Sequence, residues 1–414
     1  MKICVLGLGY IGLPTALLFA SHDNEVVGVD INKKIVEKLN MGEAPFNEFG
    51  IDELLKKAKG NFIAKTEVVH SDVFIISVPT PLEKAVKVAE LKYVRLAAEM
   101  IYPFLRQDNL VILESTVPPG TSEKLLIPIL EKSGLKIGNF HLAHCPERAI
   151  PGRTINEMIT NDRIIGGYDH KSNEITQSIY SSFVKGKMYL TDTKTAEFVK
   201  LMENTYRDVN IALANEFAQI ADECGINIWE AIELANKHPR VDVLKPGPGV
   251  GGHCIAIDPW FLTENSSKFK LISLAREIND SMPNYVLQLI RKQLKNLKEP
   301  IISIFGVSYK GNVDDTRESP AIKLIKLAEN EGYKINCYDP LAKDFEYKLH
   351  NLDEVLKDSD CIVMVTDHDI FKNIDPSKLK MRNKNLVDTR NFLNYDKWKD
   401  AGFEIITLGD GKCR

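Results

Sequence analysis

The feature that most constrains the fold is an alternation of short apolar runs with longer segments of helical periodicity. Near the N-terminus, residues 2–7, 25–30, 73–78 and 110–114 are apolar runs with the length of buried strands. The segments between them have the periodicity of helices. Strands that alternate with helices in this way form a parallel sheet with helices on both faces. The first third of the chain is therefore predicted to be a doubly wound α/β domain.

The last third of the chain repeats this rhythm. Residues 300–307 and 334–338 are predicted strands, and Ser319-Pro320 is a predicted helix start, because serine caps a helix and proline suits its first turn. The two ends also resemble each other in sequence: SDVFIISV and SDCIVMVT begin at residues 71 and 359, and VGVD and NCYD begin at residues 27 and 336. We predict two Rossmann-like domains, although doubly wound strands resemble one another in general.

Between these regions the sequence predicts one long helix. Residues 195–224 contain neither glycine nor proline, and Gly225 follows them. A helix of that length between two α/β regions can serve as a spine and as a subunit interface. The predicted domains are 1–190, 191–296 and 297–414, with the helical domain in the middle.

Composition narrows the class of protein. With 414 residues the chain exceeds what one hydrophobic core supports. Its formal net charge of -4 argues against a nucleic-acid or membrane-surface partner. No apolar run is long enough to cross a bilayer, and the N-terminus runs directly into a strand with no signal peptide.

The cysteines suggest reduced thiols. They are odd in number and widely spaced, and they form no CxxC pair and no Cys/His ligand spacing. This pattern predicts a cytoplasmic protein without a disulfide framework or a bound metal. The seven residues are Cys4, Cys145, Cys224, Cys254, Cys337, Cys361 and Cys413.

A glycine turn after the first strand predicts a dinucleotide site. Gly7, Gly9 and Gly12 form a GxGxxG pattern at the start of a helix, where glycines allow a tight turn and close approach of a pyrophosphate. The helix N-terminus adds unpaired N–H groups for the phosphates. Asp30 ends the second strand, where a carboxylate accepts ribose hydroxyls and repels a 2′-phosphate, so NAD is favoured over NADP. The alternative is a glycine turn that binds nothing.

The C-terminal region lacks a complete fingerprint. It keeps Gly306 and Gly311 only, so we expect it to bind a different nucleotide or none.

A glycine-rich loop leads to one cysteine. Residues 238–241 (HPRV) precede residues 246–254, which read PGPGVGGHC. Glycines at this density let backbone N–H groups point towards a ligand. Cys254 at the end of this loop is a candidate thiolate nucleophile if cationic neighbours lower its pKa. For an isolated cysteine, inert burial would be the better interpretation.

Lys200, Asn204 and Arg207 form a polar stripe on the predicted long helix. At about 100° per residue they lie within about 60° of one another. Such a set could hold a developing oxyanion and orient a sugar hydroxyl. A solvated helix face is the alternative.

Together these motifs resemble the UDP-glucose/GDP-mannose dehydrogenase family over nearly the whole chain. Residues 238–251 and 258–260 look most like the branch that acts on UDP-N-acetylmannosamine. The motifs are residues 7–12, 78–81 (VPTP), 114–121 (ESTVPPGT), 146–148 (PER), 200–204, 251–254 (GGHC), 309–311 (YKG) and 314–320 (DDTRESP).

The resemblance implies a four-electron oxidation at C6 of a UDP-sugar that consumes two NAD. Cys254 would attack the intermediate aldehyde, and the resulting thiohemiacetal would become a thioester that is hydrolysed to a uronate. Lys200 would transfer protons and, with Asn204, stabilise the oxyanion. Either Glu147 or Asp258 would activate the hydrolytic water, and Thr116 would position it.

The resemblance also implies binding residues and a homodimer or dimer of dimers through the helical domain. Arg240 could reach across such a dimer. The NAD contacts would be Gly7, Gly9, Tyr10, Ile11, Gly12, Asp30, Thr80, Thr116 and Arg317. The UDP-sugar contacts would be Arg148, Ala149, Lys200, Asn204, Arg207, His238, Arg240, Gly251, Tyr309, Lys310 and Arg390.

Three alternatives remain open. UDP-N-acetylglucosamine or UDP-glucose would be the substrate instead, or the chain would be a non-catalytic sensor of NAD or a nucleotide sugar. One stretch departs from the family pattern: residues 83–90 are basic and are expected to form a surface connection.

Overall fold

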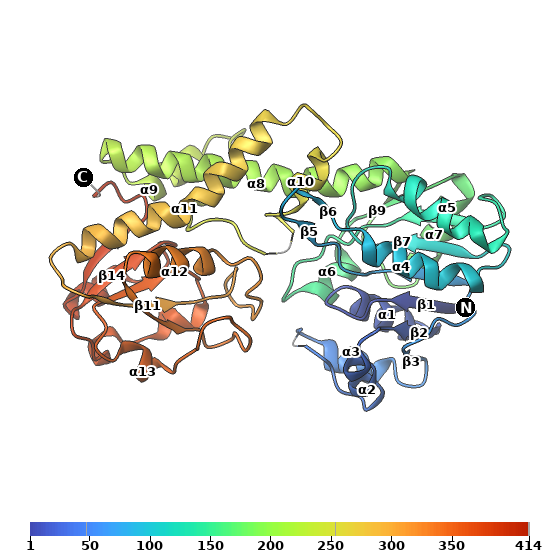
Figure 1. Cartoon of the computed structure of the whole chain (residues 1–414), viewed down its shortest axis with the longest axis horizontal. Coiled ribbons are helices and arrows are strands. Elements are labelled where there is room, and N and C mark those ends of the chain that lie inside the picture. The colour runs from blue at the N-terminus through green and yellow to red at the C-terminus, as the bar shows by residue number, and fades with distance from the viewer. Residues whose placement is uncertain (47, 253, 413–414) are drawn as a thin grey trace. The chain divides into compact units, whose positions relative to one another are not determined.

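The computed structural model describes residues 1–46, 48–252 and 254–412. The contacts divide the chain into two units. The first contains Met1–Glu203 and Trp260–Ser267, and the second contains Asn204–Pro259 and Lys268–Arg414. Figure 1 follows the chain from blue to red through both units.

The first unit is built on a sheet of eight strands in the order β10-β9-β8-β7-β4-β1-β2-β3. All neighbours are parallel except β8 and β9. The central strands are apolar along their whole length, as expected for parallel strands covered on both faces. The strands are β1 (Lys2–Leu6), β2 (Glu25–Val29), β3 (Phe62–Lys65), β4 (Val73–Ile76), β7 (Leu110–Leu113), β8 (His141–His144), β9 (Arg163–Gly167) and β10 (Met188–Asp192).

Helices cover both faces of this sheet. One core joins α1 (Gly12–Ala20), α3 (Ile51–Lys57) and α7 (His170–Tyr180) to one face, and another joins α4 (Lys92–Ile101) and α5 (Ile127–Leu130) to the opposite face. The remaining helices of this region are α2 (Lys33–Asn40) and α6 (Thr154–Thr160).

The basic stretch at residues 83–90 is more ordered than a plain surface connection. It forms an antiparallel hairpin of β5 (Leu82–Glu83) and β6 (Val88–Ala89). The Lys87 ammonium lies 3.9 Å from the centre of the Trp260 ring, and the Ala89 N–H donates to the Glu264 carboxylate at 2.9 Å. The lysine therefore contacts an aromatic face rather than only solvent.

The second unit contains a five-stranded parallel sheet in the order β12-β11-β13-β14-β15. Its helices α11 (Lys270–Leu294) and α12 (Pro320–Asn330) share one core with the sheet, whereas α13 (Leu352–Leu356) and α14 (Tyr395–Asp400) share another. The predicted cap of α12 is confirmed, because the Ser319 hydroxyl accepts the Ala321 N–H. The strands are β11 (Ile301–Phe305), β12 (Lys334–Tyr338), β13 (Cys361–Met364), β14 (Asn385–Asp388) and β15 (Glu404–Thr407).

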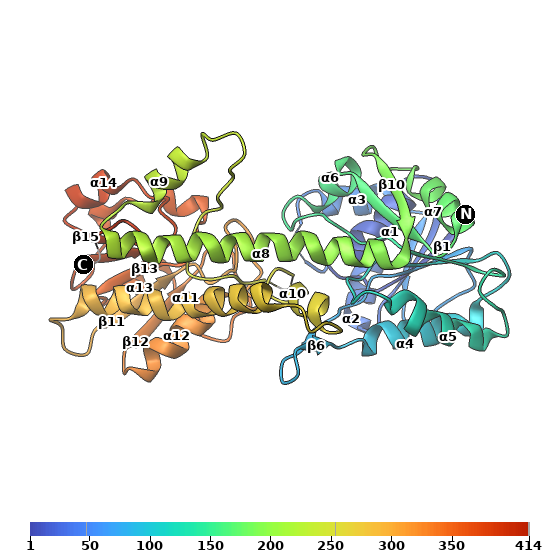
Figure 2. The ribbon, with the colours of Figure 1, turned by 90° about the horizontal axis from the view of Figure 1, so that it is seen from above.

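The predicted long helix is α8 (Thr193–Cys224). It begins in the first unit and continues into the second, and Gly225 follows it with a left-handed φ of 72°. Figure 2 shows α8 beside α11, and hydrogen bonds join Asp208 to Arg276 and Asn215 to Asn279. The shorter helix α9 (Ile228–Ala235) belongs to the second unit, whereas α10 (Asp258–Thr263) begins in the second unit and continues into the first.

The prediction of two Rossmann-like sheets joined by helices is confirmed. The resembling stretches that begin at residues 71 and 359 contain β4 and β13. Each of these strands pairs with the first strand of its sheet. The bounds of the three domains remain a prediction.

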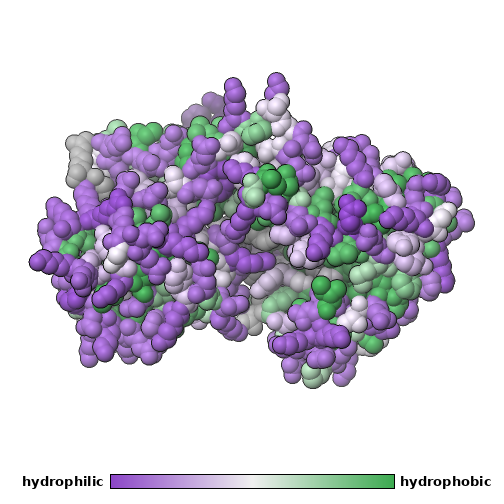
Figure 3. All heavy atoms as spheres, in the orientation of Figure 1, coloured by the Kyte–Doolittle hydropathy of each residue, from purple (hydrophilic) through white to green (hydrophobic). Residues whose placement is uncertain are grey.

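Within the described residues, no helix is both long enough and apolar enough to cross a bilayer. On the face that Figure 3 shows, apolar side chains form separate patches among hydrophilic ones.

Candidate active site

The three glycines of the first glycine turn differ in how much space surrounds them. A Cβ on Gly7, whose φ is +92°, would lie 2.4 Å from the Ser77 carbonyl oxygen. A Cβ on Gly12 would lie 2.0 Å from the Gly7 oxygen. At Gly9 a Cβ would meet nothing within 4 Å. Two glycines are thus required by packing, and the third leaves open space beside the N-terminus of α1, where phosphates bind.

Asp30 is fixed beside this turn. One of its carboxylate oxygens accepts the Leu8 N–H at 2.9 Å and the other accepts the Asn32 N–H at 2.8 Å. The side chain is half-buried, so acceptor positions face outward. The carboxylate is therefore held where ribose hydroxyls could donate to it.

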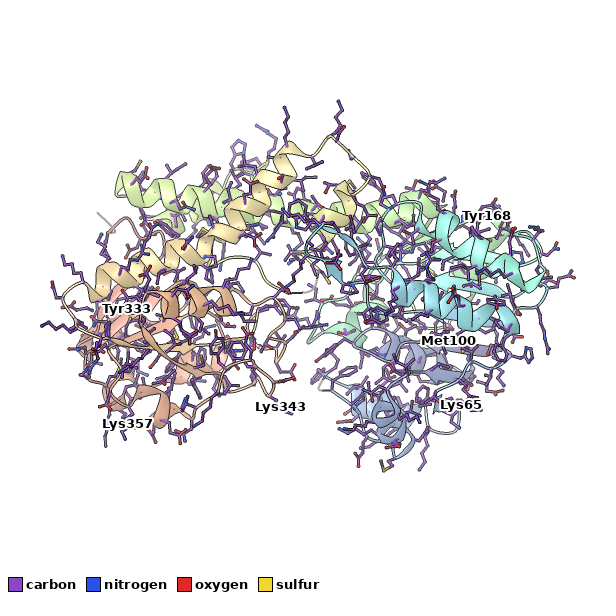
Figure 4. The ribbon with its side chains drawn as sticks, viewed as in Figure 1. Lys65, Met100, Tyr168, Tyr333, Lys343 and Lys357 are labelled. Atoms are coloured by element: carbon purple, nitrogen blue, oxygen red, sulfur yellow. The ribbon has the colours of Figure 1, made fainter. Side chains whose placement is uncertain are left out.

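A cavity of about 300 Å³ adjoins Asp30. Its walls are mostly apolar and include Ile31, Val78, Tyr93 and Met100. Figure 4 labels Met100 on α4. An apolar slot beside a carboxylate suits an adenine ring with its ribose, so these residues fit the adenosine half of NAD.

The loops after β4 and β7 carry two further predicted cofactor residues, Thr80 and Thr116. Ser115 ties the loops together, because its hydroxyl donates to the Val78 oxygen at 2.7 Å and accepts the Val78 N–H at 2.9 Å. Thr80 is buried and Thr116 is half-buried. Both therefore lie on loops at the carboxyl edge of the sheet, where ligands of such folds bind.

Tyr10 and Ile11 lie in the glycine turn itself. The Tyr10 ring packs on Phe46 with ring centres 4.4 Å apart, and Ile11 is the residue before α1. Arg317, which was also predicted to contact NAD, belongs to the second unit and forms two hydrogen bonds to Asp315, at 2.9 and 2.7 Å.

Glu147 is the centre of a buried cluster. One oxygen pairs with Arg163 at 2.7 Å, and the other accepts the N–H groups of Arg148 and Ala149 at 2.7 and 2.8 Å. Burial, and then the charge of Glu147, raise the pKa of neighbouring Glu114 to about 7. The cluster thus fixes the turn that holds Arg148 and Ala149.

The Arg148 guanidinium is already engaged within the first unit. It contacts the Glu203 carboxylate at 3.1 and 2.7 Å and donates to the Asp162 oxygen at 2.8 Å. Sequence reasoning missed Glu203, although it stands directly before the predicted Asn204. A substrate phosphate would have to share or replace this ion pair.

Lys200 is half-buried on α8 near a neutral histidine. Burial lowers the pKa of His144 to about 3, and the nearby charge of Lys200 acts in the same direction. His144 was not predicted, although it stands two residues before the PER motif. A neutral ring at His144 adds no positive charge beside the Lys200 ammonium.

In the second unit the structure brings Cys254, Asp258 and Asn204 together. The Cys254 thiol is exposed, and its carbonyl oxygen accepts the N–H groups of Ile257 and Asp258 at 3.0 and 2.9 Å. The buried Asp258 carboxylate accepts the Asn204 amide at 2.5 Å. The turn after the cysteine therefore fixes the amide that was predicted to bind an oxyanion.

Tyr309 packs against the glycine loop that leads to Cys254. A Cβ on Gly252, whose φ is +83°, would lie 2.8 Å from the Tyr309 ring, and one on Gly251 would lie 2.9 Å from the Tyr309 Cβ. Burial raises the pKa of Tyr309 to about 12, with smaller contributions from Asp315 and Cys254, while Arg317 and then Arg207 lower it. Tyr309 therefore lies near both Cys254 and Arg207.

Arg390 lies against the start of the same loop. A Cβ on Gly247 would be 2.8 Å from its Nη1, and its Nε donates to the Val365 oxygen at 3.0 Å. Burial lowers the pKa of this guanidinium. Glycine is thus required where the loop crosses the arginine.

The remaining predicted substrate residues are exposed. Lys310 follows Tyr309, and Arg207 lies on α8. His238 and Arg240 share a turn after α9, in which the His238 ring accepts the Arg240 N–H at 3.3 Å. His253 lies outside the described residues. No group of three or more His, Cys, Asp or Glu within the described part of the chain could hold a metal ion.

Three domains of the UDP-glucose/GDP-mannose dehydrogenase family match the chain. The NAD binding domain matches residues 1–184, the central domain residues 194–281, and the UDP binding domain residues 303–395.

Similar proteins extend over the whole length. A UDP-N-acetyl-D-mannosamine dehydrogenase of Methanocaldococcus jannaschii is 52% identical over 99% of this chain and 97% of its own. An NDP-N-acetyl-D-galactosaminuronic acid dehydrogenase of Ralstonia nicotianae is 43% identical over 94% and 95%. The solved UDP-D-ManNAc dehydrogenase of Pyrococcus horikoshii has a TM-score of 0.92 at 43% identity and covers all of both chains.

Proposed function

The chain belongs to the UDP-glucose/GDP-mannose dehydrogenase family and is a NAD-dependent nucleotide-sugar dehydrogenase, and on this premise we propose that its substrate is UDP-N-acetyl-D-mannosamine. The enzyme oxidises C6 of the sugar to give UDP-N-acetyl-D-mannosaminuronate. The names of relatives at 51–52% identity support this sugar. The exposed Cys254 beside the Asn204–Asp258 pair is the observation that carries the chemistry.

The proposed reaction has two oxidations and one hydrolysis. NAD supplies the acceptor for the hydride that leaves C6 in each oxidation. The C6 hydroxyl first loses its proton while a hydride leaves C6, and the product is an aldehyde. The Cys254 thiolate then adds to the aldehyde carbon, and the adduct becomes a thioester when its hydroxyl proton and a second hydride from C6 leave. Water cleaves the carbon–sulfur bond, which releases the carboxylate and restores the thiolate.

Lys200 and Asn204 stabilise the oxygen of the thiol adduct in this proposal. They are one helical turn apart on α8, so both side chains project from one face. The bond to Asp258 uses one N–H of the Asn204 amide and fixes its plane. The second N–H, with the Lys200 ammonium, can then donate to the developing oxyanion. Lys200 also exchanges the proton of the C6 oxygen.

Hydrolysis needs a base, and two candidates remain. Glu147 already accepts three hydrogen bonds of about four that a carboxylate can take, and Asp258 accepts the Asn204 amide. Thr116 positions the water. Replacing the true base by its amide, in Glu147→Gln or Asp258→Asn, should leave a stable thioester, which mass spectrometry detects as an adduct on Cys254.

The other predicted contacts serve binding. In the first unit, Gly7, Gly9, Tyr10, Ile11, Gly12, Asp30, Thr80 and Thr116 hold NAD. Arg317 adds a contact to NAD. The nucleotide sugar is held by Arg148, Ala149, Arg207, His238, Arg240, Gly251, Tyr309, Lys310 and Arg390. Arginine suits this task, because its planar fork binds phosphate oxygens in pairs.

We propose a homodimer through α8. Exposed apolar side chains recur along this helix at intervals of three, four or seven residues, which places them within about 100° of one another. Lys200, Asn204 and Arg207 lie on the opposite side of the helix. A charge in this stripe, as in Phe217→Glu, should convert the dimer into a monomer in sedimentation velocity. The exposed residues are Phe198, Met202, Tyr206, Leu213, Phe217 and Ile220.

The substrate is tested by comparing kcat/KM for UDP-N-acetylmannosamine, UDP-N-acetylglucosamine and UDP-glucose. A site that hydrogen-bonds the acetamido group in one configuration should prefer the first sugar by tenfold or more in kcat/KM. A factor of about ten corresponds to the loss of one hydrogen bond. Preference for either other sugar would replace the proposed substrate. A sensor would turn over none of them, and alkylation of Cys254 would then have no activity to remove.

A further inference from the structure

The loop after β11 contains two of the predicted substrate contacts, Tyr309 and Lys310. Its first residues are anchored to Asp339, the residue after β12. One oxygen of Asp339 accepts the N–H groups of Val307 and Ser308 at 2.7 and 3.1 Å, and the Ser308 hydroxyl at 3.1 Å. The loop therefore leaves its strand in a fixed direction.

Asn312 anchors the other end of the loop. Its backbone is left-handed, with φ at 64°, and its N–H donates to Nδ1 of His368 at 2.9 Å. The Asn312 side chain also forms a reciprocal pair with Asp369, with bonds of 2.6 and 2.9 Å. Three hydrogen bonds thus hold a backbone conformation that a non-glycine residue rarely adopts.

His368 joins the two anchors. The ring is fully buried, and its Nε2 lies 3.0 Å from the same Asp339 oxygen that holds Ser308. Because Nδ1 accepts the Asn312 N–H, the proton of the ring must be on Nε2, which donates to Asp339. The edge of the ring meets Phe371, with centres 5.3 Å apart. One imidazole therefore clamps both ends of the loop.

We propose that His368 and Asp339 are positioning residues that hold Tyr309 and Lys310 in the geometry for binding the uridine diphosphate part of the substrate. The inference rests on the proposed function, which makes the YKG motif a substrate contact. The clamp works through backbone N–H groups, so it fixes the loop without occupying the side chains of Tyr309 and Lys310.

Two substitutions separate the two bonds of the imidazole. In His368→Asn the amide oxygen can take the place of Nδ1 and still accept the Asn312 N–H. In His368→Gln the amide nitrogen can take the place of Nε2 and still donate to Asp339. We expect His368→Gln to weaken UDP binding about tenfold, because it removes the acceptor of the Asn312 N–H from this partly buried hydrogen bond. His368→Asn should weaken it less.

Two substitutions at exposed positions test the clamp even if the variants of the buried His368 do not fold. Asp369→Ala removes the side-chain partner of Asn312 at an exposed position, and we expect UDP affinity to fall about threefold, as for one exposed hydrogen bond. The matched control is Lys372→Ala, because Lys372 contacts Asp369 at 2.7 Å but is no partner of Asn312 in the bonds above. This control should bind UDP as the unmodified protein does.

The measurement is calorimetric titration of the full-length protein with UDP alone and, separately, with NAD alone. The clamp predicts weaker UDP binding with unchanged NAD binding in His368→Gln and Asp369→Ala, and a rise in KM for the sugar nucleotide that exceeds the fall in kcat. UDP affinity equal to that of the unmodified protein in both variants would overturn the clamp alone. Failure of the unmodified protein to bind UDP would instead overturn the proposed function.

Discussion

Two aspartates at matching places in the two sheets have different environments. Asp30 follows β2 and Asp339 follows β12, and each accepts an N–H from the turn after the first strand of its sheet. Asp30 is half-buried and accepts one further N–H. Asp339 is 6% exposed, and its oxygens accept N–H groups, the Ser308 hydroxyl and the His368 ring.

The glycine turns show the same contrast. Gly7 and Gly306 are both left-handed, and each packs just after the neighbouring strand, against Ser77 directly after β4 or against Thr366 two residues after β13. Only the first turn continues to an open position, at Gly9. The comparison teaches that one backbone plan can serve two tasks. A carboxylate with outward acceptors is available to a ligand, whereas one surrounded by donors holds the protein's own loop.

The largest expected effect is on stability. Asp339→Asn replaces one oxygen of a buried carboxylate by an NH2 group, which cannot accept hydrogen bonds from the surrounding N–H donors. We expect this substitution to lower the free energy of unfolding by about 3 kcal/mol. Asp30→Asn should cost less than about 1 kcal/mol, because solvent reaches that side chain. Urea unfolding of both variants measures this difference. Equal losses would show that the two acids have equivalent structural roles.

The pH dependence of stability should follow Asp339. Burial alone would raise its pKa, but the hydrogen bonds from His368 and from backbone N–H groups hold the pKa well below its usual range. A depressed carboxyl pKa stabilises the fold above the unfolded value, near about 4, and that stability is lost as pH falls below it. Asp339→Asn should flatten this acid limb in unfolding curves.

The glycines should separate folding from binding. Gly12→Ala places a Cβ 2.0 Å from a backbone oxygen and should cost about 2 kcal/mol of stability. Gly9→Ala meets nothing in the protein, so thermal unfolding should be unchanged, while NAD affinity falls about tenfold as the methyl group occupies phosphate space. Unchanged NAD binding in Gly9→Ala would contradict the assignment of this turn to the pyrophosphate.

The smallest expected change is in cofactor choice. Asp30→Ser removes the charge that repels a 2′-phosphate, so the ratio of kcat/KM for NADP to that for NAD should rise about tenfold. The corresponding change at Asp339 should not alter this ratio in any protein that remains folded. A shift in the ratio for both variants would break the distinction between the two acids.

Local patterns were enough to predict much of the fold. Apolar runs located β1, β2, β4, β7, β11 and β12, and the absence of glycine and proline located α8. The sequence did not indicate β9, whose residues Arg163–Gly167 mix a buried arginine with two glycines. The arginine belongs there because Glu147, which lies 16 positions earlier on a different segment, neutralises it.

The candidate site was predictable where a motif is continuous, as in the first glycine turn and the loop to Cys254. Partners that meet only after folding were missed. Glu203 pairs with Arg148 across 55 positions, and His368 reaches Asp339 across 29. The hydrophobic periodicity of the sequence does not indicate such pairs, because each partner is an ordinary polar residue in its own segment.

The central claim is that a single thiol carries the sugar through two oxidations. The most direct measurement is the number of NADH formed per UDP-sugar consumed, with the product identified by mass spectrometry. The account predicts two NADH and one uronate for the unmodified enzyme, and no uronate from Cys254→Ser. One NADH per sugar, or complete uronate formation by Cys254→Ser, would contradict it.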